Sequence, residues 1–296
     1  MRLRLLTIFF SFWLIGLLPS AVLAKANLII ILDDLGYRPS DIAAFSLPKE
    51  VAFSILPQTP LAAKIAKRAD REGRSVMLHM PMQAKSGLKL GPLGLTTDMY
   101  KGEISHTVKA ALRSVPNAVG LNNHMGSAFT LQEEAMEVLM EEVKRQGLFY
   151  IDSRTTVLSK GEAVAKRLGV PNASRHIFLD HELTESFLSK QFERMKHIAK
   201  RNGVAVAIGH PHPMTVNFLK KHLLTLEKEE FNLMSLDEYF SYAPKVAKRK
   251  EDALQIAELG RVTTHQQSTA LEKPKSNVLM NAVESSKMTE VALNDE

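Results

Sequence analysis

Short apolar runs alternate along this chain with longer stretches in which apolar residues recur at helical spacing. The runs are rich in Val, Ile and Leu, as is typical of buried parallel strands. They predict strands at residues 27–32, 51–56, 75–79, 118–123, 147–152, 176–180 and 204–209, with a weaker strand at 232–236. Seven β–α units favour a β/α barrel, complete or distorted, and an open doubly wound sheet is the alternative.

Helices are predicted between these strands, at residues 62–72, 101–114, 131–146, 184–201 and 214–227. The helix at 131–146 has the clearest periodicity, and we expect Thr130 to cap its start and Gly147 to end it. Residues 83–97 contain Gly87, Gly91, Pro92 and Gly94 and predict a long loop. That loop is expected either to contact substrate or to be a surface excursion.

Six of the apolar runs end in a carboxylate or an imidazole. The residues at these ends are Asp33, Asp34, His79, His124, Asp152, Asp180 and His210. Because the carboxyl ends of the strands of a β/α barrel share one face, these side chains are expected to meet at one mouth.

Three of the strand-end residues form a candidate metal site. Asp34, His79 and His124 would supply three nitrogen or oxygen ligands from three strand ends, which with an open position is the pattern of catalytic zinc. Each His alone is more often structural, and an isolated Asp-Asp pair more often caps a turn. Pro81 is expected to keep His79 out of a continuing helix or a central strand.

The neighbouring residues suggest supporting roles. One carboxylate of the Asp33–Asp34 pair can bind an ion while the other acts as a general base. In the segment Gly209-His210-Pro211-His212-Pro213, His210 is the candidate general acid.

Further polar residues at the strand ends are predicted to orient ligands or to contact substrate. They are Asp152, Arg154, Asn123 and Ser127. Arg154 would pair with Asp33 or with substrate. Helix capping and ordinary salt bridges are the alternative for Asp152, and they are favoured for Asp180.

Composition narrows the chemistry. The chain has no cysteine, which excludes disulfides, thiolate ligands and cysteine nucleophiles and leaves a divalent ion, zinc above all, held by His and Asp. The net charge of +6 is mild, and no basic stripe interleaves with aromatic residues, so a nucleic-acid partner is not expected.

The two ends of the chain differ from its middle. Arg2 and Arg4 precede a nearly continuous apolar stretch from Leu5 to Leu18, and Val22-Leu23-Ala24 has the form of a cleavage site. These features predict a signal peptide at residues 1–24, hence export to the periplasm or envelope with no stable membrane span after cleavage; an uncleaved anchor is the alternative. Residues 245–296 are polar and lack aromatic residues, which predicts a disordered tail after a domain at 25–244.

Five motifs in order resemble one family. They are Ile-Leu-Asp-Asp-Leu-Gly-Tyr, Leu-His-Met-Pro-Met, Asn-His-Met-Gly-Ser, Asp-Ser-Arg-Thr and Gly-His-Pro-His-Pro. The set is similar to that of the divergent polysaccharide deacetylases, relatives of the NodB-type carbohydrate esterases, over residues 26–242. The resemblance implies an α/β fold with a distorted seven-stranded β/α barrel and a zinc-like ion held by one Asp and two His.

Mapped onto this chain, the resemblance makes Asp33 the base, Asp34 a ligand, His79 the first His of the second motif and His210 the late catalytic His. Two positions depart from the family pattern. Gln83 stands where the second motif has another His, and Asn-His-Met-Gly-Ser replaces an Arg-containing motif, so that His124 becomes the substitute ligand.

Three functions are open on this basis. The first is an exported hydrolase that removes N-acetyl groups from an envelope polysaccharide, peptidoglycan-like in kind, by attack of metal-bound water. The second is a non-catalytic envelope protein that keeps the barrel and a metal site and binds glycan or a protein partner. The third is a metal-free glycosidase that uses two of Asp33, Asp34, Asp152 and Asp180, which leaves the strand-end histidines unexplained.

Overall fold

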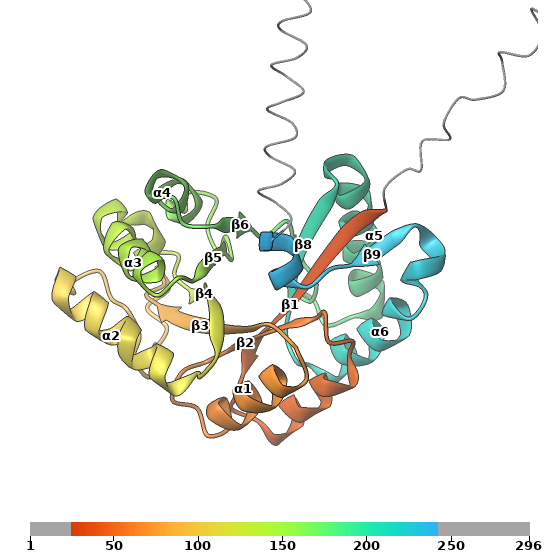
Figure 1. Cartoon of the computed structure of the whole chain (residues 1–296), viewed down its shortest axis with the longest axis horizontal. Coiled ribbons are helices and arrows are strands. Elements are labelled where there is room, and N and C mark those ends of the chain that lie inside the picture. Colours follow the sequence, from red (N-terminus) through yellow and green to blue (C-terminus); the bar gives the residue numbers. More distant parts are fainter. Residues whose placement is uncertain (1–24, 242–296) are drawn as a thin grey trace, which may run out of the picture. The chain divides into compact units, whose positions relative to one another are not determined.

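A computed structural model describes residues 25–241 of the chain (Figure 1). The predicted signal peptide at 1–24 and the predicted tail at 245–296 lie outside the described residues. No helix in the described range is long and apolar enough to cross a membrane.

Strands and helices alternate along the described residues. In chain order they are β1 Ala26–Leu35, the 3-10 helix η1 Pro39–Ser46, β2 Ala52–Ile55, α1 Ala62–Arg71, β3 Val76–Met82, α2 Lys101–Ser114, β4 Ala118–Met125, η2 Phe129–Leu131, α3 Glu133–Arg145, β5 Phe149–Asp152, α4 Gly161–Leu168, β6 Asn172–Ser174, β7 Ile177–Phe178, α5 Glu185–Asn202, β8 Val204–Gly209, α6 Pro213–Leu223, η3 Leu226–Glu229 and β9 Phe231–Leu233. The apolar periods thus predicted most elements, and they missed the short helices η1, η2 and η3 as well as α4 and β6.

The strands form one curled parallel sheet in the order β6-β5-β4-β3-β2-β1-β8-β7, with β9 beside the start of β1. Residues 172–178 link the two ends of this order: β6 pairs with β5, and β7 pairs with β8. Between them, the amide of Arg175 donates to the carbonyl of Asp152, and the amide of His176 donates to that of Val206. Counted as one bent strand, this segment gives a distorted seven-stranded barrel, which confirms the predicted fold.

Side chains alternate between the two faces of the sheet, as the pleat requires. The odd-numbered Ile29 and Ile31 of β1 join an inner apolar cluster with residues of β2, β3, β5 and β8. The even-numbered Leu28, Ile30 and Leu32 join the larger outer cluster, which the helices cover (Figure 1). Both faces of β1 are therefore buried, which explains its continuous apolar run.

The amino-terminal end of the barrel is filled by the segment that follows β9. Met234, Leu236 and Phe240 belong to or pack against the inner cluster, and the ring of Phe240 stacks on Phe149 at 4.3 Å between centroids. Residues 236–241 are helical, so the predicted strand at 232–236 is wrong in its second half. Because this end is plugged, the opposite end is left for a site.

Two local predictions were wrong. The residue at the start of α3 is Gln132, and Thr130 lies in η2, where its hydroxyl donates to the carbonyl of Gly126. Pro81 lies inside β3, which is a central strand. Pairing of β3 with β2 ends at Leu78, so the missing amide of Pro81 costs no bond to β2.

Glu142 gives the outer layer a pH-dependent contact. Its carboxylate is fully buried between α2 and α3 and accepts hydrogen bonds from Ser105 at 2.9 Å and Gln146 at 2.8 Å. Burial opposes its charge, but these bonds, with Arg145 and Lys109, lower the pKa of Glu142.

Because the pKa is lower in the folded state, the contribution of Glu142 to stability is present above the unfolded value near ~4.3 and is lost as pH falls below it. We expect Glu142→Gln to lower the free energy of unfolding at pH 7 by about 1 kcal/mol, since both cationic partners are largely exposed. The difference from wild type should shrink below pH 4 in urea titrations. The adjacent exposed Glu141→Gln is the control, and a Glu142→Gln difference that stays constant with pH would contradict the assignment.

Candidate metal centre and active site

Two adjacent carboxylates reach the barrel mouth at the end of β1. Asp33 follows Ile29 and Ile31 on the inner face and is 3% exposed. The next residue would point outward in a regular strand. The pairing of β1 with β2 instead shifts register between Leu32 and Leu35, and Asp34 adopts the left-handed region at φ 61°. Asp tolerates this conformation better than most residues, and the irregularity turns both carboxylates into the mouth.

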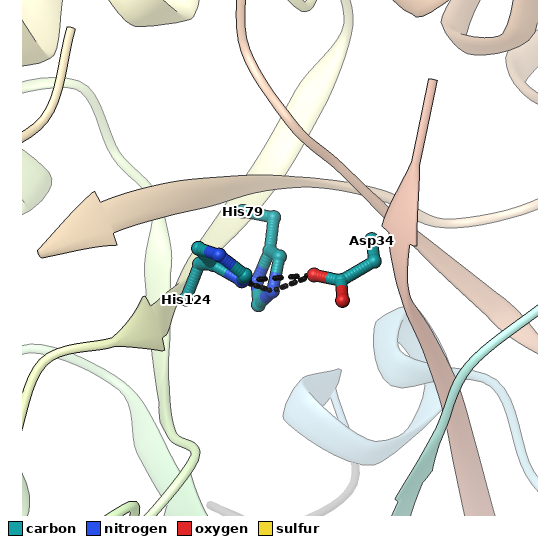
Figure 2. Close-up of side chains that lie close together, drawn as sticks. All are labelled: Asp34, His79 and His124. Atoms are coloured by element: carbon teal, nitrogen blue, oxygen red, sulfur yellow. Dashed lines mark hydrogen bonds and ion pairs between the residues drawn. The ribbon is translucent and has the colours of Figure 1, made fainter. Parts of the chain in front are cut away.

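Asp34 at the end of β1 meets two imidazoles from strands beyond β2, one from β3 and one from β4 (Figure 2). Its Oδ1 lies 3.0 Å from Nε2 of His79 in β3 and 2.8 Å from Nδ1 of His124 in β4. The two imidazole nitrogens are 3.2 Å apart. The three residues predicted as metal ligands therefore converge on one point.

The donor set fits a divalent ion. A tetrahedron with bonds of ~2.0–2.1 Å has edges of about 3.3 Å, close to the three separations above. Oδ1 of Asp34 is buried, and apart from these two imidazole nitrogens it has no polar partner among the described residues. Burial opposes its charge, but the facing His124 and His79 hold the pKa of Asp34 far below its usual range. A carboxylate oxygen that faces two imidazole nitrogens in a pocket without cysteine is suited to zinc or a similar ion.

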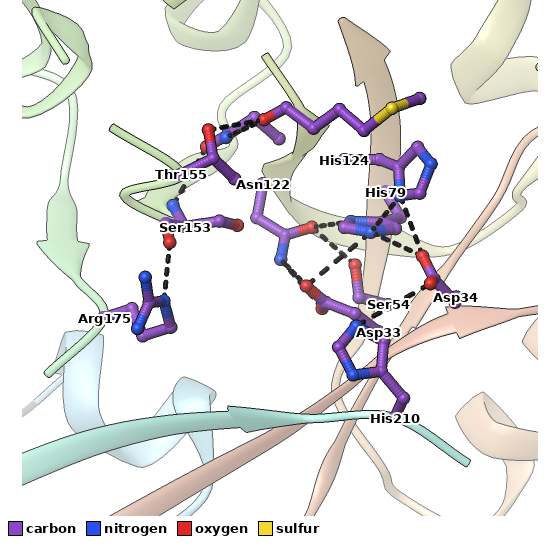
Figure 3. A network of polar contacts seen from close by, with 12 residues as sticks. Asp33, Asp34, Ser54, His79, Asn122, His124, Ser153, Thr155, Arg175 and His210 are labelled. Carbon is purple, nitrogen blue, oxygen red and sulfur yellow. Dashed lines mark hydrogen bonds and ion pairs between the residues drawn. The ribbon is translucent and has the colours of Figure 1, made fainter. Parts of the chain in front are cut away.

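Asn122 lies beside His79 and links its ring to Asp33 (Figure 3). Its amide nitrogen donates to both oxygens of Asp33, at 2.9 and 3.1 Å. Its amide oxygen accepts from the hydroxyl of Ser54 at 2.6 Å and lies 2.7 Å from Nδ1 of His79. A carboxylate only accepts hydrogen bonds, so the NH2 group of the Asn122 side chain must be the end that faces Asp33. The amide oxygen then faces His79, and Nδ1 of His79 must carry the proton and donate to it. The Nε2 lone pair of His79 is then free to bind a cation.

The buried carboxylate of Asp33 and the ring of His79 influence each other. Burial raises the pKa of Asp33, and the charges of His79 and His210 and the bond from Asn122 offset it in part. Burial disfavours the charged form of His79, but Asp33 and Asp34 raise its pKa above the ordinary value. Asp33 is therefore a base with a raised pKa, 3.6 Å from the ring that would carry the ion.

His210 follows β8 on the other side of the mouth. Its Nδ1 lies 2.9 Å from Oδ1 of Asp180, and its Nε2 lies 3.7 Å from Oδ2 of Asp34. Burial disfavours its charge, but Asp180, followed by Asp34 and Asp33, raises the pKa of His210 to about 9. Since Asp180 accepts from Nδ1, the proton on Nε2 faces the mouth, as a general acid requires.

Asp180, His210 and His212 also lie close enough to suggest a second metal group. The hydrogen bonds argue against it. Oδ2 of Asp180 accepts from the amide of His210 at 2.7 Å and from the hydroxyl of Thr215 at 2.8 Å, and Oδ1 faces His210. The carboxylate is committed to holding His210, which makes an acid with its orienting partner the better interpretation.

The residues predicted to support the site lie in different places. The carboxylate of Asp152 faces away from the three candidate ligands Asp34, His79 and His124. It accepts hydrogen bonds from the amide of Glu162 and the hydroxyl of Ser159 at the start of α4. It is used as a cap, the alternative open from the sequence. One prediction paired Arg154 with Asp33. In the structure Arg154 pairs with Glu162 instead, at 3.5 Å, and the carboxylate of Asp33 accepts from Asn122.

Asn123 and Ser127 both hold backbone near the mouth. Oδ1 of Asn123 accepts from the amide of Ser153, and the hydroxyl of Ser127 accepts from the amide of Lys85. The long loop at 83–97 lines neither of the two cavities at the mouth, which favours the surface-excursion interpretation.

The sequence did not single out Ser54, Asn122 or Arg175, and it favoured a structural role for Asp180. Asn122 and Asn123 look equivalent in the chain, and only the pleat sends Asn122 inward. Its pairing in register with His79 could have been found from the aligned ends of the two strands. Arg175 lies in the bent closing segment, for which no periodic signal exists.

Comparison with known proteins agrees with this architecture. The model of the family "Divergent polysaccharide deacetylase" matches residues 30–240. An uncharacterized protein of Haemophilus influenzae is 37% identical over 215 residues, 72% of this chain and 77% of the relative. The uncharacterized protein YibQ of Escherichia coli is 37% identical over 210 residues, 71% of this chain and 66% of that protein.

Among solved structures, that of an uncharacterized protein from Agrobacterium tumefaciens is similar in fold. It aligns with a TM-score of 0.69 at 21% identity and covers 74% of this chain and 90% of its own. The segment that the family model matches, residues 30–240, spans nearly all of the described barrel and includes Asp33, Asp34, His79, His124, Asp180 and His210. The chain belongs to the divergent polysaccharide deacetylase family.

Proposed function

We propose that this protein is an exported, metal-dependent hydrolase that removes N-acetyl groups from an envelope polysaccharide. The observation that carries the proposal is the convergence of Asp34, His79 and His124, with Asp33 on one side and His210 on the other. Membership of the family supports the reaction class, and the apolar leader at residues 1–24 supports export.

A divalent ion bound by the three ligands would polarise the acetamide carbonyl and lower the pKa of water at the site. The chain itself supplies the proton transfers. Asp33 accepts the proton of the attacking water, since burial raises its pKa and Asn122 fixes both of its oxygens. His210 donates the proton from Nε2 to the departing amine, while Asp180 holds Nδ1.

The proposed acid gives a pH dependence. His210 is protonated below its pKa of about 9, so the deacetylation rate should fall as pH rises through that value. Asp180→Asn keeps an acceptor for Nδ1 but removes the charge that raises the pKa, so the alkaline limb should move toward the ordinary value near ~6.5. Hydrolysis of an aryl acetate, whose leaving group needs no proton, should show no such fall in rate at alkaline pH. An unchanged limb in Asp180→Asn would exclude His210 as the acid.

The function is tested by acetate release from N-acetylglucosamine oligomers. The full chain is stripped with a chelator, assayed, reloaded with one equivalent of zinc and assayed again. Release that disappears on stripping and returns on loading supports the proposal. No release from zinc-loaded protein on any N-acetylated glycan would contradict it.

One observation favours a non-catalytic alternative. Gln83 stands where the family motif has a His, and its Oε1 accepts from the amide and hydroxyl of Thr97 at 2.7 and 3.0 Å. Its side chain therefore braces the loop. Stoichiometric zinc and glycan binding without acetate release would identify the protein as a binder that has kept the barrel.

A further inference from the structure

The cavity over the metal cluster has a cationic wall. This cavity of about 420 Å³ is lined by Asp33, Asp34 and His79, and also by Arg154 and Arg175. The carboxylates already face His79, His124 and Asn122. The two guanidinium groups are not required to neutralise them.

Arg175 is fixed by its own backbone contacts. Its Nε donates to the carbonyl of Ser153 at 2.6 Å (Figure 3). Its Nη2 donates to the carbonyl of Arg154 at 2.8 Å. Among residues 25–241, no carboxylate forms an ion pair with it. Nη1 has no protein acceptor among the contacts of these residues. The guanidinium is thus positioned at the cavity by backbone contacts, with Asp33 and Asp152 acting on its charge only from beyond ion-pair distance.

Arg154 is held in a strained conformation beside it. Its φ is 47°, and Met125, which lines the same cavity, has φ 53°. The hydroxyl of Thr155 donates to the carbonyl of Met125 and ties the two loops together. Non-glycine residues in this region cost about 1–3 kcal/mol each and persist where the surroundings fix them, most often at functional sites.

The side chain of Arg154 remains available. Its contact with Glu162 is 3.5 Å long, and 51% of the side chain is exposed. Glu162 is also bound by Lys166 and Ser174, so it stays paired when Arg154 turns away. Exposed ion pairs of this kind contribute little to stability.

Phe178 continues the same wall toward the acid. Its ring centroid lies 5.2 Å from the guanidinium carbon of Arg175 and 5.3 Å from the ring of His210. The wall therefore offers an apolar face between a fixed cation and the residue that would protonate the leaving amine. A sugar against Phe178 could present a substituent to the arginines.

We propose that Arg154 and Arg175 bind a carboxylate carried by the glycan next to the reacting N-acetyl sugar, so that the substrate is an anionic N-acetylated polysaccharide. Two forked guanidinium groups match the planar geometry of a carboxylate. This inference rests on the proposed deacetylation for its position, and it adds the chemical class of the substrate.

The test compares two tetrasaccharides that differ only in charge. One alternates N-acetylglucosamine with N-acetylmuramic acid, whose lactyl group is a free carboxylate. In the other, each lactyl carboxylate is a methylamide. The four proteins compared are wild type, Arg154→Gln, Arg175→Lys and the exposed α1 control Arg71→Gln, each checked for folding by circular dichroism. Acetate release gives kcat/KM of each protein for both glycans. Calorimetry gives Kd for both glycans after Asp33→Asn has been added to each protein.

We expect wild type and Arg71→Gln to prefer the carboxylate form about tenfold, and Arg154→Gln to reduce that ratio several-fold. Arg175→Lys should reduce it as well, because a lysine keeps the charge but loses the fork. Equal ratios in wild type and both arginine variants would overturn the anion site while the deacetylase proposal stands. Absence of acetate release from both glycans would overturn the proposed reaction, and the Kd ratio would then decide the anion site by itself.

Discussion

His79→Ala is expected to lower zinc affinity by more than 100-fold. The substitution removes one of three protein ligands, and replacing even an outer partner of a ligand commonly costs 10–100-fold. It also leaves the amide oxygen of Asn122 without the ring that donates to it. Zinc content of the purified full chain by elemental analysis and zinc affinity by competition with a chelator measure the effect.

His124→Ala should have the same result, which matters because His124 is the ligand that the family motif did not supply. The control is His106→Ala on the exposed face of α2, which should retain one zinc per chain. Full zinc content in His124→Ala would show that the ion is held without β4. The substitute-ligand hypothesis would then be wrong.

Asp33→Asn is expected to leave zinc content unchanged and to reduce turnover by about 10²–10⁴-fold. The amide keeps the size of the side chain but cannot accept the proton of water, and it replaces a carboxylate that accepts two bonds from Asn122. Asp33 approaches the ligand cluster only at 3.6 Å, whereas Asp34 faces both imidazoles within 3.0 Å. Substitutions of the two adjacent carboxylates should therefore have different effects on zinc content.

The measurement is kcat for acetate release beside zinc content in the same preparation. Asp34→Asn is the matched comparison, since it should lose zinc as well as turnover. A fully active Asp33→Asn protein would show that another group takes the proton. Loss of zinc in Asp33→Asn would instead make Asp33 a ligand.

The network around Asn122 explains why these effects should be specific. Asn122 is fully buried and joins Ser54, His79 and Asp33 in one chain of hydrogen bonds. Buried polar groups of this kind are costly when a partner is lost, so they hold a single geometry. The base and the ligand are thereby oriented by one amide.

The strand-end residues could be predicted because the physical signal is local. An apolar run that stops at Asp33, His79 or His210 marks the strand and the half of it nearer its carboxyl end, although β1 and β3 continue two or three residues further. Parallel strands must share that end. The sequence by itself therefore determined the fold class and the face that bears the site, and it picked out the three candidate ligands Asp34, His79 and His124 that the structure brings together.

The tertiary structure decided which of two neighbouring polar side chains points into the barrel mouth. The register shift at Asp34 turned two adjacent carboxylates into one mouth, and the pleat sent Asn122 inward while Asn123 holds backbone. Asp180 reached His210 only because β7 and β8 pair, and Arg175 reached the cavity only because residues 172–178 bend from β5 to β8. These contacts join segments far apart in the chain, and their geometry depends on bulges and bends that no periodic pattern of side chains encodes.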